Sequence, residues 1–384
     1  MVLLTKGRFA VKVNVDKTGT VEGLQKVIQE TTAYESVQSL LIMACDANEF
    51  TPETVDEILA GVSVPVIGGI FPEIIHGREK LTQGTIAAGL SRPMDAQIIP
   101  GLSDTAVDYS QIIDKKFPDI GQAKTMFVFV DGLTSRIGDL IDSLFEIFGL
   151  EINYVGGGAG SLSFQQKPCL FTNQGLIQDS AVLGLIEMSS GVGVSHGWQS
   201  ISGPYKMTGV ERNVIKTLDW KPAFAVYRQI VEEASGQTFT DDNFFDIAKG
   251  YPFGINRAGA EKIVRDPIAT DENGTLICVG EVPADGYVDI LSGNKESLVH
   301  AAETAFADGR AAYDGAAGEQ CALFIDCISR VLFLEDEFTA ELDAVYDENI
   351  PLIGALTLGE IANCGDDYLE FYNKTAVVAV LDNQ

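Results

Sequence analysis

Three stretches of this 384-residue chain follow one plan, and that internal repeat constrains the fold more than any other feature. In each stretch an apolar segment is followed by an amphipathic one, a second apolar segment that carries a glycine, and a third apolar segment. The first segments lie at 39–45, 125–131 and 322–327, the second at 65–74, 154–161 and 351–361, and the third at 85–90, 181–187 and 375–381. Every unit is therefore predicted to contain a strand, a helix, a strand, a connection and a further strand.

The apolar and amphipathic segments together indicate the fold class. The first segment of each unit is nearly continuously apolar, which is typical of a strand covered on both faces. In the first unit Thr51 and Pro52 are helix-start signals, and Val55, Leu59 and Val62 then fall on one helical face. A strand, a helix and a strand in this order form a right-handed crossover between parallel strands. We expect an α/β protein with two lobes of repeated β-α-β-β units, whose mixed, largely parallel sheets are covered by helices.

The chain is long enough for two domains, and its pattern changes between the second and third units. From residue 192 to about residue 313, short predicted strands alternate with turn signals such as Asn273-Gly274 and Asp285-Gly286. We place the division between residues 191 and 192, which gives domains 1–191 and 192–384. Because no proline-rich linker separates them, we expect the two lobes to pack closely.

The charge balance argues against two classes of partner. The chain has 55 acidic and 26 basic residues, a formal charge of −29, so its surface repels phosphate backbones and anionic lipids. We expect no nucleic-acid or membrane partner, and we see neither an export signal nor a membrane-spanning stretch. The six cysteines lack C-x-x-C spacing, which suits reduced thiols in the cytoplasm.

A glycine recurs where the second strand of each unit is expected to end, at Gly68, Gly156 and Gly354. In two units a glutamate follows at a similar distance, Glu73 and Glu360. Because α/β sheets bind ligands beyond the carboxyl ends of their strands, these positions favour a shared crevice. The alternative is a tight exit from each strand without a ligand.

Several spaced segments resemble the FIST family. They are the region 192–231, which contains VGVSHGW, and the runs ALFIDCISRVLFL (322–334), IPLIGALTLGEI (350–361) and FYNKTAVVAVL (371–381), all similar to the C-terminal half of FIST proteins. VPVIGGIFPEI (64–74) and YVGGGAG (154–160) resemble the N-terminal half. The resemblance implies a FIST N-terminal-like domain at 1–191 and a FIST C-terminal-like domain at 192–384.

The resemblance also implies a function. FIST proteins are sensory modules of signal transduction, usually joined to chemoreceptor, histidine-kinase or cyclic-dinucleotide output domains, and amino acids have been suggested as their ligands. We see no output domain in this sequence, so we expect a separate signalling partner such as a kinase or a chemoreceptor component. The sequence leaves a monomer and a homo-oligomer both open.

Three residues match characteristic FIST positions: Cys327, Arg330 and Glu360. A guanidinium suits a ligand carboxylate and Glu360 could meet an ammonium, which together suit an amino-acid-like zwitterion. The alternative is an internal ion pair between Arg330 and Glu360. The full predicted ligand-binding set is Arg330, Glu360, Cys327, Gly354, Asn373, Glu73, Gly156 and Gly157.

Two further functions stay open at this point. Some family members bind haem and respond to nitric oxide, and His196 matches a family position, so it is our candidate axial ligand; a hydrogen-bonded structural histidine is the alternative. Cys327 could instead be an enzyme nucleophile, assisted by Glu360 or His196 and activated by Arg330. Since Cys327 ends an apolar strand, a buried inert thiol is favoured. We therefore expect a ligand-binding sensor without turnover and without a cofactor.

Overall fold

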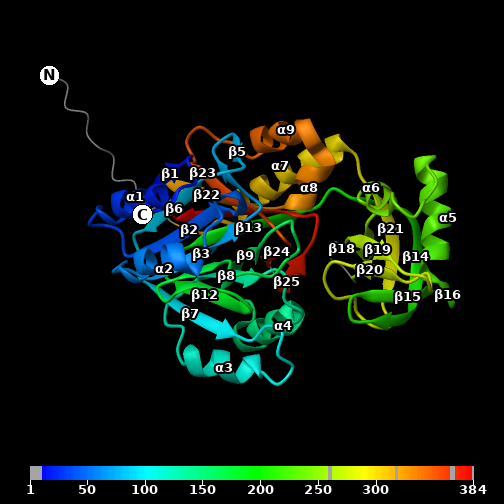
Figure 1. Ribbon diagram of the computed structural model, residues 1–384, viewed down its shortest axis with the longest axis horizontal. Helices are drawn as coiled ribbons and strands as arrows, with labels where there is room; N and C mark the ends of the chain where they lie inside the picture. The colour runs from blue at the N-terminus through cyan, green and yellow to red at the C-terminus, as the bar shows by residue number, and fades with distance from the viewer. Residues whose placement is uncertain (1–10, 258–261, 316–318, 364–367, 383–384) are drawn as a thin grey trace.

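The computed structural model describes residues 11–257, 262–315, 319–363 and 368–382. Its elements form a larger body and a smaller lobe that lies to one side of it (Figure 1). The lobe is built from residues 199–292, and the body from the elements before and after that segment. The chain thus enters the lobe from the body and returns to the body.

The body consists of three units with a common order of elements: strand, helix, strand, helix, strand, hairpin and last strand, with two helices instead of one at the second helical place of the third unit. The first unit contains β1 (Lys12–Asp16), α1 (Val21–Thr32), β2 (Ser39–Cys45), α2 (Pro52–Ala60), β3 (Val66–Phe71), β4 (Glu73–His76), β5 (Glu79–Leu81) and β6 (Thr85–Leu90). The second contains β7 (Met94–Pro100), α3 (Tyr109–Lys116), β8 (Thr125–Asp131), α4 (Ile137–Phe148), β9 (Asn153–Ala159), β10 (Leu170–Thr172), β11 (Gly175–Ile177) and β12 (Ser180–Ile186). The third contains β13 (Ser190–Ser195), α7 (Lys295–Ala312), β22 (Gln320–Cys327), α8 (Ile328–Leu334), α9 (Phe338–Ala344), β23 (Leu352–Thr357), β24 (Glu360–Ala362), β25 (Glu370–Tyr372) and β26 (Ala376–Asp382). The predicted repeat is confirmed, and each unit also has a strand and a helix before the segments that we recognised.

The lobe is inserted between β13 and α7 of the third unit. Its elements are β14 (Gln199–Glu211), β15 (Val214–Leu218), β16 (Lys221–Pro222), α5 (Ala223–Ser235), α6 (Phe244–Ala248), β17 (Phe253–Ile255), β18 (Ile263–Arg265), β19 (Pro267–Thr270), β20 (Leu276–Cys278) and β21 (Tyr287–Ser292). The strands of the lobe form one antiparallel sheet, and the lobe has its own apolar core around Tyr227 and Phe253. This lobe does not have the order of elements of the three units, so the expectation of two lobes built from repeats is wrong.

The three sheets of the body share one strand order and exchange their hairpins. The orders are β1-β6-β2-β3, β7-β12-β8-β9 and β13-β26-β22-β23. Hairpin β10–β11 of the second unit pairs with β3, hairpin β24–β25 of the third with β9, and hairpin β4–β5 of the first with β23. Each unit therefore gives one hairpin and receives another, which joins the first and last thirds of the chain. The position at which we expect the chain to divide, between residues 191 and 192, lies within β13.

Among the strands that the structure describes, parallel pairing occurs only at the predicted crossovers. β2 pairs with β3, β8 with β9, and β22 with β23, all in parallel. The neighbouring pairs, such as β2 with β6 and β22 with β26, are antiparallel. The α/β class and the mixed sheets are confirmed, but most strand pairs are antiparallel rather than parallel, because only the connection through a helix returns the chain in the same direction.

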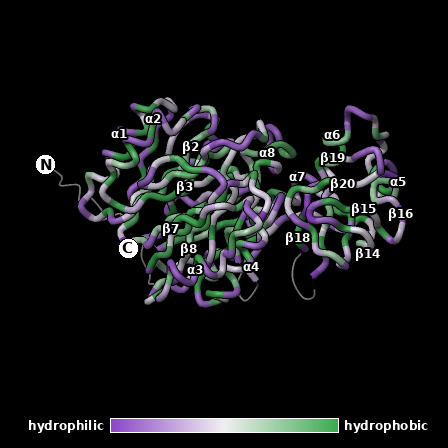
Figure 2. Tube along the Cα trace, turned by 60° about the horizontal axis from the view of Figure 1, so that its bottom comes forward, coloured by the Kyte–Doolittle hydropathy of each residue, from purple (hydrophilic) through white to green (hydrophobic). Residues whose placement is uncertain are grey.

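One face of each sheet contributes to a common core, and helices cover the other face. In β8, Phe127 and Phe129 belong to the common core, whereas Met126 packs towards α3 and α4. In β22, Ile325 faces the common core and Phe324 packs under α7, α8 and α9. Figure 2 shows the resulting apolar strands β2, β3 and β8 within the body. Burial on both faces explains the continuous apolar runs in the sequence.

The three recurrent glycines lie inside strands, so the prediction that they end the strands is wrong. Gly68, Gly156 and Gly354 pair with equivalent residues of β2, β8 and β22. A Cβ atom would lie 1.8 Å from the neighbouring carbonyl oxygen at Gly68 and Gly156, and 2.0 Å from it at Gly354. The glycines recur because the two parallel strands approach too closely for any side chain at this point.

Candidate functional site

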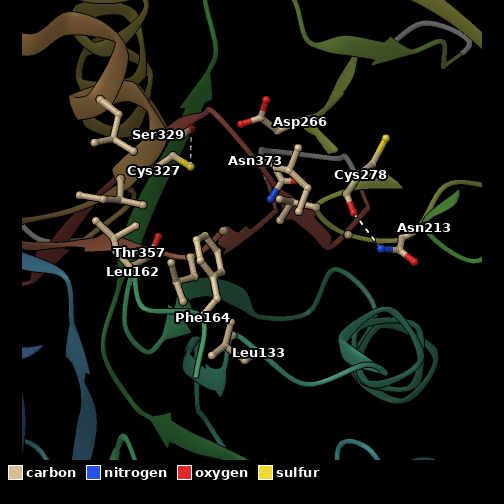
Figure 3. Close-up of a pocket in the computed structure, with 18 of the residues that line it drawn as sticks. Leu133, Leu162, Phe164, Asn213, Asp266, Cys278, Cys327, Ser329, Thr357 and Asn373 are labelled. Atoms are coloured by element: carbon tan, nitrogen blue, oxygen red, sulfur yellow. Dashed lines mark hydrogen bonds between the residues drawn. The ribbon is translucent and has the colours of Figure 1, made fainter. Parts of the chain in front are cut away.

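A cavity of about 470 Å³ lies where the lobe meets the body (Figure 3). The body supplies the segment 132–134 after β8, residues of the loop after β9, and the carboxyl ends of β22 and β23. The lobe supplies residues of α6, β19 and β20 and the segment that follows β20. A crevice therefore does lie beyond the carboxyl ends of the central strands, between the second and third units.

Cys327 is the last residue of β22 and lines this cavity. Its Sγ atom lies 3.0 Å from Ser329 Oγ (Figure 3). Burial, and then the nearby Glu360, raise the pKa of the Cys327 thiol above its usual range. The thiol is therefore protonated at neutral pH, which makes it a poor nucleophile.

Glu360 is the first residue of β24 and is completely buried behind the cavity wall. Its Oε1 accepts a hydrogen bond from Thr357 Oγ1 at 3.0 Å, and its Oε2 accepts one from the Thr375 amide at 3.2 Å. Burial raises the pKa of Glu360 to about 8. Since Glu360 is mostly protonated at neutral pH and does not line the cavity, its predicted contact with a ligand ammonium is not supported.

Arg330 is also completely buried and is held by the protein itself. All five of its N–H groups have acceptors or an ion-pair partner within the body, so none is left for a ligand. Nε and Nη2 both donate to the Glu341 carboxylate, and Nη2 also donates to Leu298 O. Nη1 donates to His196 O and Lys374 O. Asp326 Oδ1 lies 3.0 Å from Nε. The predicted contact with a ligand carboxylate is therefore not supported, and the ion-pair partners are Asp326 and Glu341 rather than Glu360.

Two oxygen atoms of the cavity lining lack partners. Asn373 and Asp266 are 2% and 4% exposed, and the Oδ1 atom of each is buried without a hydrogen-bond partner among the described residues. The other carboxylate oxygen of Asp266 lies 3.1 Å from Lys374 Nζ. Buried acceptors without a donor are costly, so these atoms mark a place where a ligand donor would be stabilised.

The sequence matches the model of the FIST N domain over residues 39–221 and that of the FIST C domain over residues 223–363. The chain belongs to the FIST family. FIST domains are sensory domains of signal transduction and are thought to bind small ligands. No curated protein matches the sequence significantly.

Both FIST domains contribute to the cavity. Leu133 and Phe164 come from the part that matches the FIST N domain, and Asp266 and Cys327 from the part that matches the FIST C domain. Asn373 lies beyond the matched residues. Of the predicted set, the structure thus brings Cys327 and Asn373 to the cavity, and it adds Asp266, which no sequence pattern indicated.

Gly156 and Gly157, the predicted site glycines within the FIST N domain, matter because they have no side chain. A Cβ atom on Gly157 would lie 2.7 Å from Gly359 O, and the Gly158 amide donates to that same oxygen at 2.8 Å. The segment 357–359, which forms part of the cavity wall, can therefore lie directly on β9. Gly156 and Gly354 do not line the cavity.

Glu73 also lies away from the cavity lining. It begins β4, and its Oε2 lies 2.8 Å from Lys80 Nζ of β5. Glu73 therefore belongs to the exchanged hairpin, and its predicted ligand contact is not supported.

His196 does not fit an axial haem ligand. It is buried, does not line the cavity, and its Nδ1 accepts a hydrogen bond from the Trp198 amide at 2.8 Å. In a neutral imidazole with one accepting nitrogen, the other nitrogen carries the proton and has no lone pair for iron. Burial, and then Arg330, lower the pKa of His196 to about 4, which keeps the ring neutral. Within the described part of the chain there is also no cluster of side chains suited to a metal ion.

An adjoining cavity of about 320 Å³ shares the segment 132–134 and extends to the start of α4. Arg212 and Arg265 line it, and Arg212 Nη2 lies 3.2 Å from Glu281 Oε1. Arg265 donates through Nε to Glu281 O at 2.8 Å and through Nη1 to Phe371 O at 3.0 Å. The bond to Phe371 joins the lobe to the body beside the larger cavity.

None of the helices in the described ranges has both the length and the apolar character that a membrane span requires.

Proposed function

We propose that this FIST protein is a sensor that binds a small molecule in the 470 Å³ cavity and reports it through the position of the lobe. The observation that carries the proposal is that lobe and body close this cavity together, with the buried Oδ1 atoms of Asp266 and Asn373 left without donors. The cavity volume falls within the usual range for small-molecule sites.

The contacts across the cavity support a conformational response. Asp266 belongs to the lobe and Lys374 to the body, and their ion pair lies beside the cavity. Lys374 Nζ also donates to Lys249 O of the lobe at 2.9 Å. A ligand that contacts both parts binds one lobe position more tightly than others, and it shifts the population by that difference in affinity. A separate signalling protein could then recognise the changed surface.

We further propose that the site binds without turnover and without a cofactor. Two observations support binding over thiol catalysis or haem ligation: the Cys327 thiol is protonated, and His196 is not among the lining residues and accepts a hydrogen bond from the Trp198 amide. The ligand is thus expected to leave the protein chemically unchanged.

Thermal denaturation with a metabolite library tests the proposal. A ligand at 100 times its dissociation constant stabilises the folded state by about 2.7 kcal/mol, which is a rise in melting temperature of roughly 3 °C for a chain of 384 residues. Ser329→Phe places a large side chain in the cavity and should abolish the shift, whereas Ser103→Phe at an exposed turn should retain it. A shift that survives in Ser329→Phe would place the ligand elsewhere and contradict the proposal.

A further inference from the structure

The cavity presents hydrogen-bond acceptors to a ligand. Asp266 and Asn373, whose Oδ1 atoms lack partners among the described residues, both lie beside the segment 279–280 of the lobe. The Val279 amide donates to Asp266 O at 2.9 Å, and a Cβ atom on Gly280 would lie 3.3 Å from Asn373 Oδ1. A carboxylate oxygen and an amide oxygen can both accept from an ammonium, which has three donors.

The described lining also lacks a cationic side chain for an anionic ligand. Among its lining residues that the structure describes, Asp266 is the one with a charged side chain. Lys374 approaches the far oxygen of Asp266, donates to Lys249 O, and lies 5.2 Å from the centre of the Trp198 ring. Its ammonium is therefore engaged outside the cavity. A ligand carboxylate would find no cation until the adjoining cavity that Arg212 and Arg265 line.

Much of the remaining lining is apolar, and part of it is exposed. Phe164 is 62% exposed, and Leu162, Phe245 and Leu332 are also exposed although all four line this cavity. Figure 3 shows Phe164 and Leu133 across the cavity from Asp266 and Asn373. Exposed apolar side chains gathered at an opening mark a binding surface. The cavity thus has a polar end with acceptors and an apolar end near solvent.

We propose that the cavity binds a protonated organic amine that carries an apolar group. The ammonium donates to Oδ1 of Asp266 and of Asn373, and the apolar group covers Phe164 and Leu332. This inference rests on the proposed sensory site and specifies its ligand class. Amines without an apolar group lose the contacts with Phe164 and Leu332. Anions cannot donate to the Asp266 carboxylate and are repelled by it.

Calorimetric titration of the full chain with three matched probes tests this ligand class. The probes are 2-phenylethylamine, a cation; phenylacetate, an anion; and phenylalanine, a zwitterion. We expect 2-phenylethylamine to bind at least about tenfold more tightly than either of the others, since a charged hydrogen bond contributes about this factor. Tighter binding of phenylacetate or phenylalanine, or no binding of 2-phenylethylamine at millimolar concentration, would overturn the inference.

Two substitutions locate the amine. Asn373→Leu removes an acceptor that has no partner within the described protein and should weaken 2-phenylethylamine binding about tenfold. Phe164→Ser should weaken it to a similar degree, while Trp220→Ser, an exposed aromatic residue outside the cavity lining, should not. Unchanged affinity in both Asn373→Leu and Phe164→Ser would also overturn the inference.

The outcomes separate this inference from the proposed function. If phenylalanine binds best and Asn373→Leu weakens it, the cavity is a ligand site but takes a zwitterion, so only the ligand class is wrong. If a ligand from the metabolite screen keeps its shift in Ser329→Phe, the sensory site itself is misplaced.

Discussion

Glu360→Gln should make the stability of this protein less dependent on pH. In the folded state burial raises the pKa of Glu360 from 4.5 to about 8. Between these two values the folded protein holds a proton that the unfolded chain has released. The free energy of unfolding that comes from Glu360 is therefore fully present below pH 4.5 and is lost as the pH rises towards 8. Glutamine carries no titratable proton, so the free energy of unfolding of the variant does not fall in this way as the pH rises.

The magnitude follows from the linkage relation. Each pH unit within the window changes the free energy of unfolding by about 1.36 kcal/mol. Between pH 6 and pH 9 the wild type should therefore lose about 2.5 kcal/mol more than Glu360→Gln. At pH 6 the variant should be the less stable protein by about 1–2 kcal/mol, because its amide cannot accept from both Thr357 and Thr375. Near pH 9 the two proteins should be equally stable, or the variant should be the more stable one.

Urea unfolding of both proteins at pH 6, 7, 8 and 9 measures this difference. Glu272→Gln, at an exposed position, is the control and should show no such change with pH. A constant difference between wild type and Glu360→Gln across this range would mean that Glu360 is ionised throughout in the folded protein. That result would refute the argument from burial.

The remaining predictions concern packing, the buried cation and the thiol. Gly156→Ala should lower the free energy of unfolding by at least about 2 kcal/mol in urea, because its Cβ would lie 1.8 Å from Val128 O. Gly236→Ala, with φ of +68° and open space around it, should cost only about 1 kcal/mol, and equal costs would contradict the steric explanation. Arg330→Met should cost about 3–5 kcal/mol in the same assay, since two buried carboxylates lose their cation; a change below about 1 kcal/mol would show that this network is unimportant. Cys327 should react slowly with iodoacetamide in the native protein by mass spectrometry, and rapid stoichiometric labelling would favour the enzyme interpretation.

Much of the body could be predicted from local sequence. The bounds 39–45, 85–90 and 125–131 coincide with those of β2, β6 and β8. Strands buried on both faces are continuous apolar runs, and the segment between two such strands has helical periodicity. These signals depend on a few neighbouring residues, so the sequence determines the units, their crossovers and the equivalence of Gly68, Gly156 and Gly354.

The exchange of hairpins and the insertion of the lobe were not predictable in this way. The short strands β4, β10 and β24 pair with other units, and His76 lies opposite Ile353, far along the chain. Pairing over such distances is decided by which sheet edge is free after the units pack. The exchanged pairs, β3 with β10, β9 with β24 and β23 with β4, are all antiparallel and add to the antiparallel pairs within each unit.

The candidate site shows the same division between local and tertiary information. Sequence alone placed Cys327 at the end of a strand and Asn373 near the start of another, and both line the cavity. It could not show that Arg330 turns into the body towards Glu341, or that docking of the lobe brings Asp266 to the same cavity as Asn373. A residue's type and spacing fix what chemistry it can perform and which element carries it. Which groups it meets depends on how whole units pack, because the burial that directs Arg330 inwards and isolates the Oδ1 atoms of Asp266 and Asn373 exists only in the assembled tertiary structure.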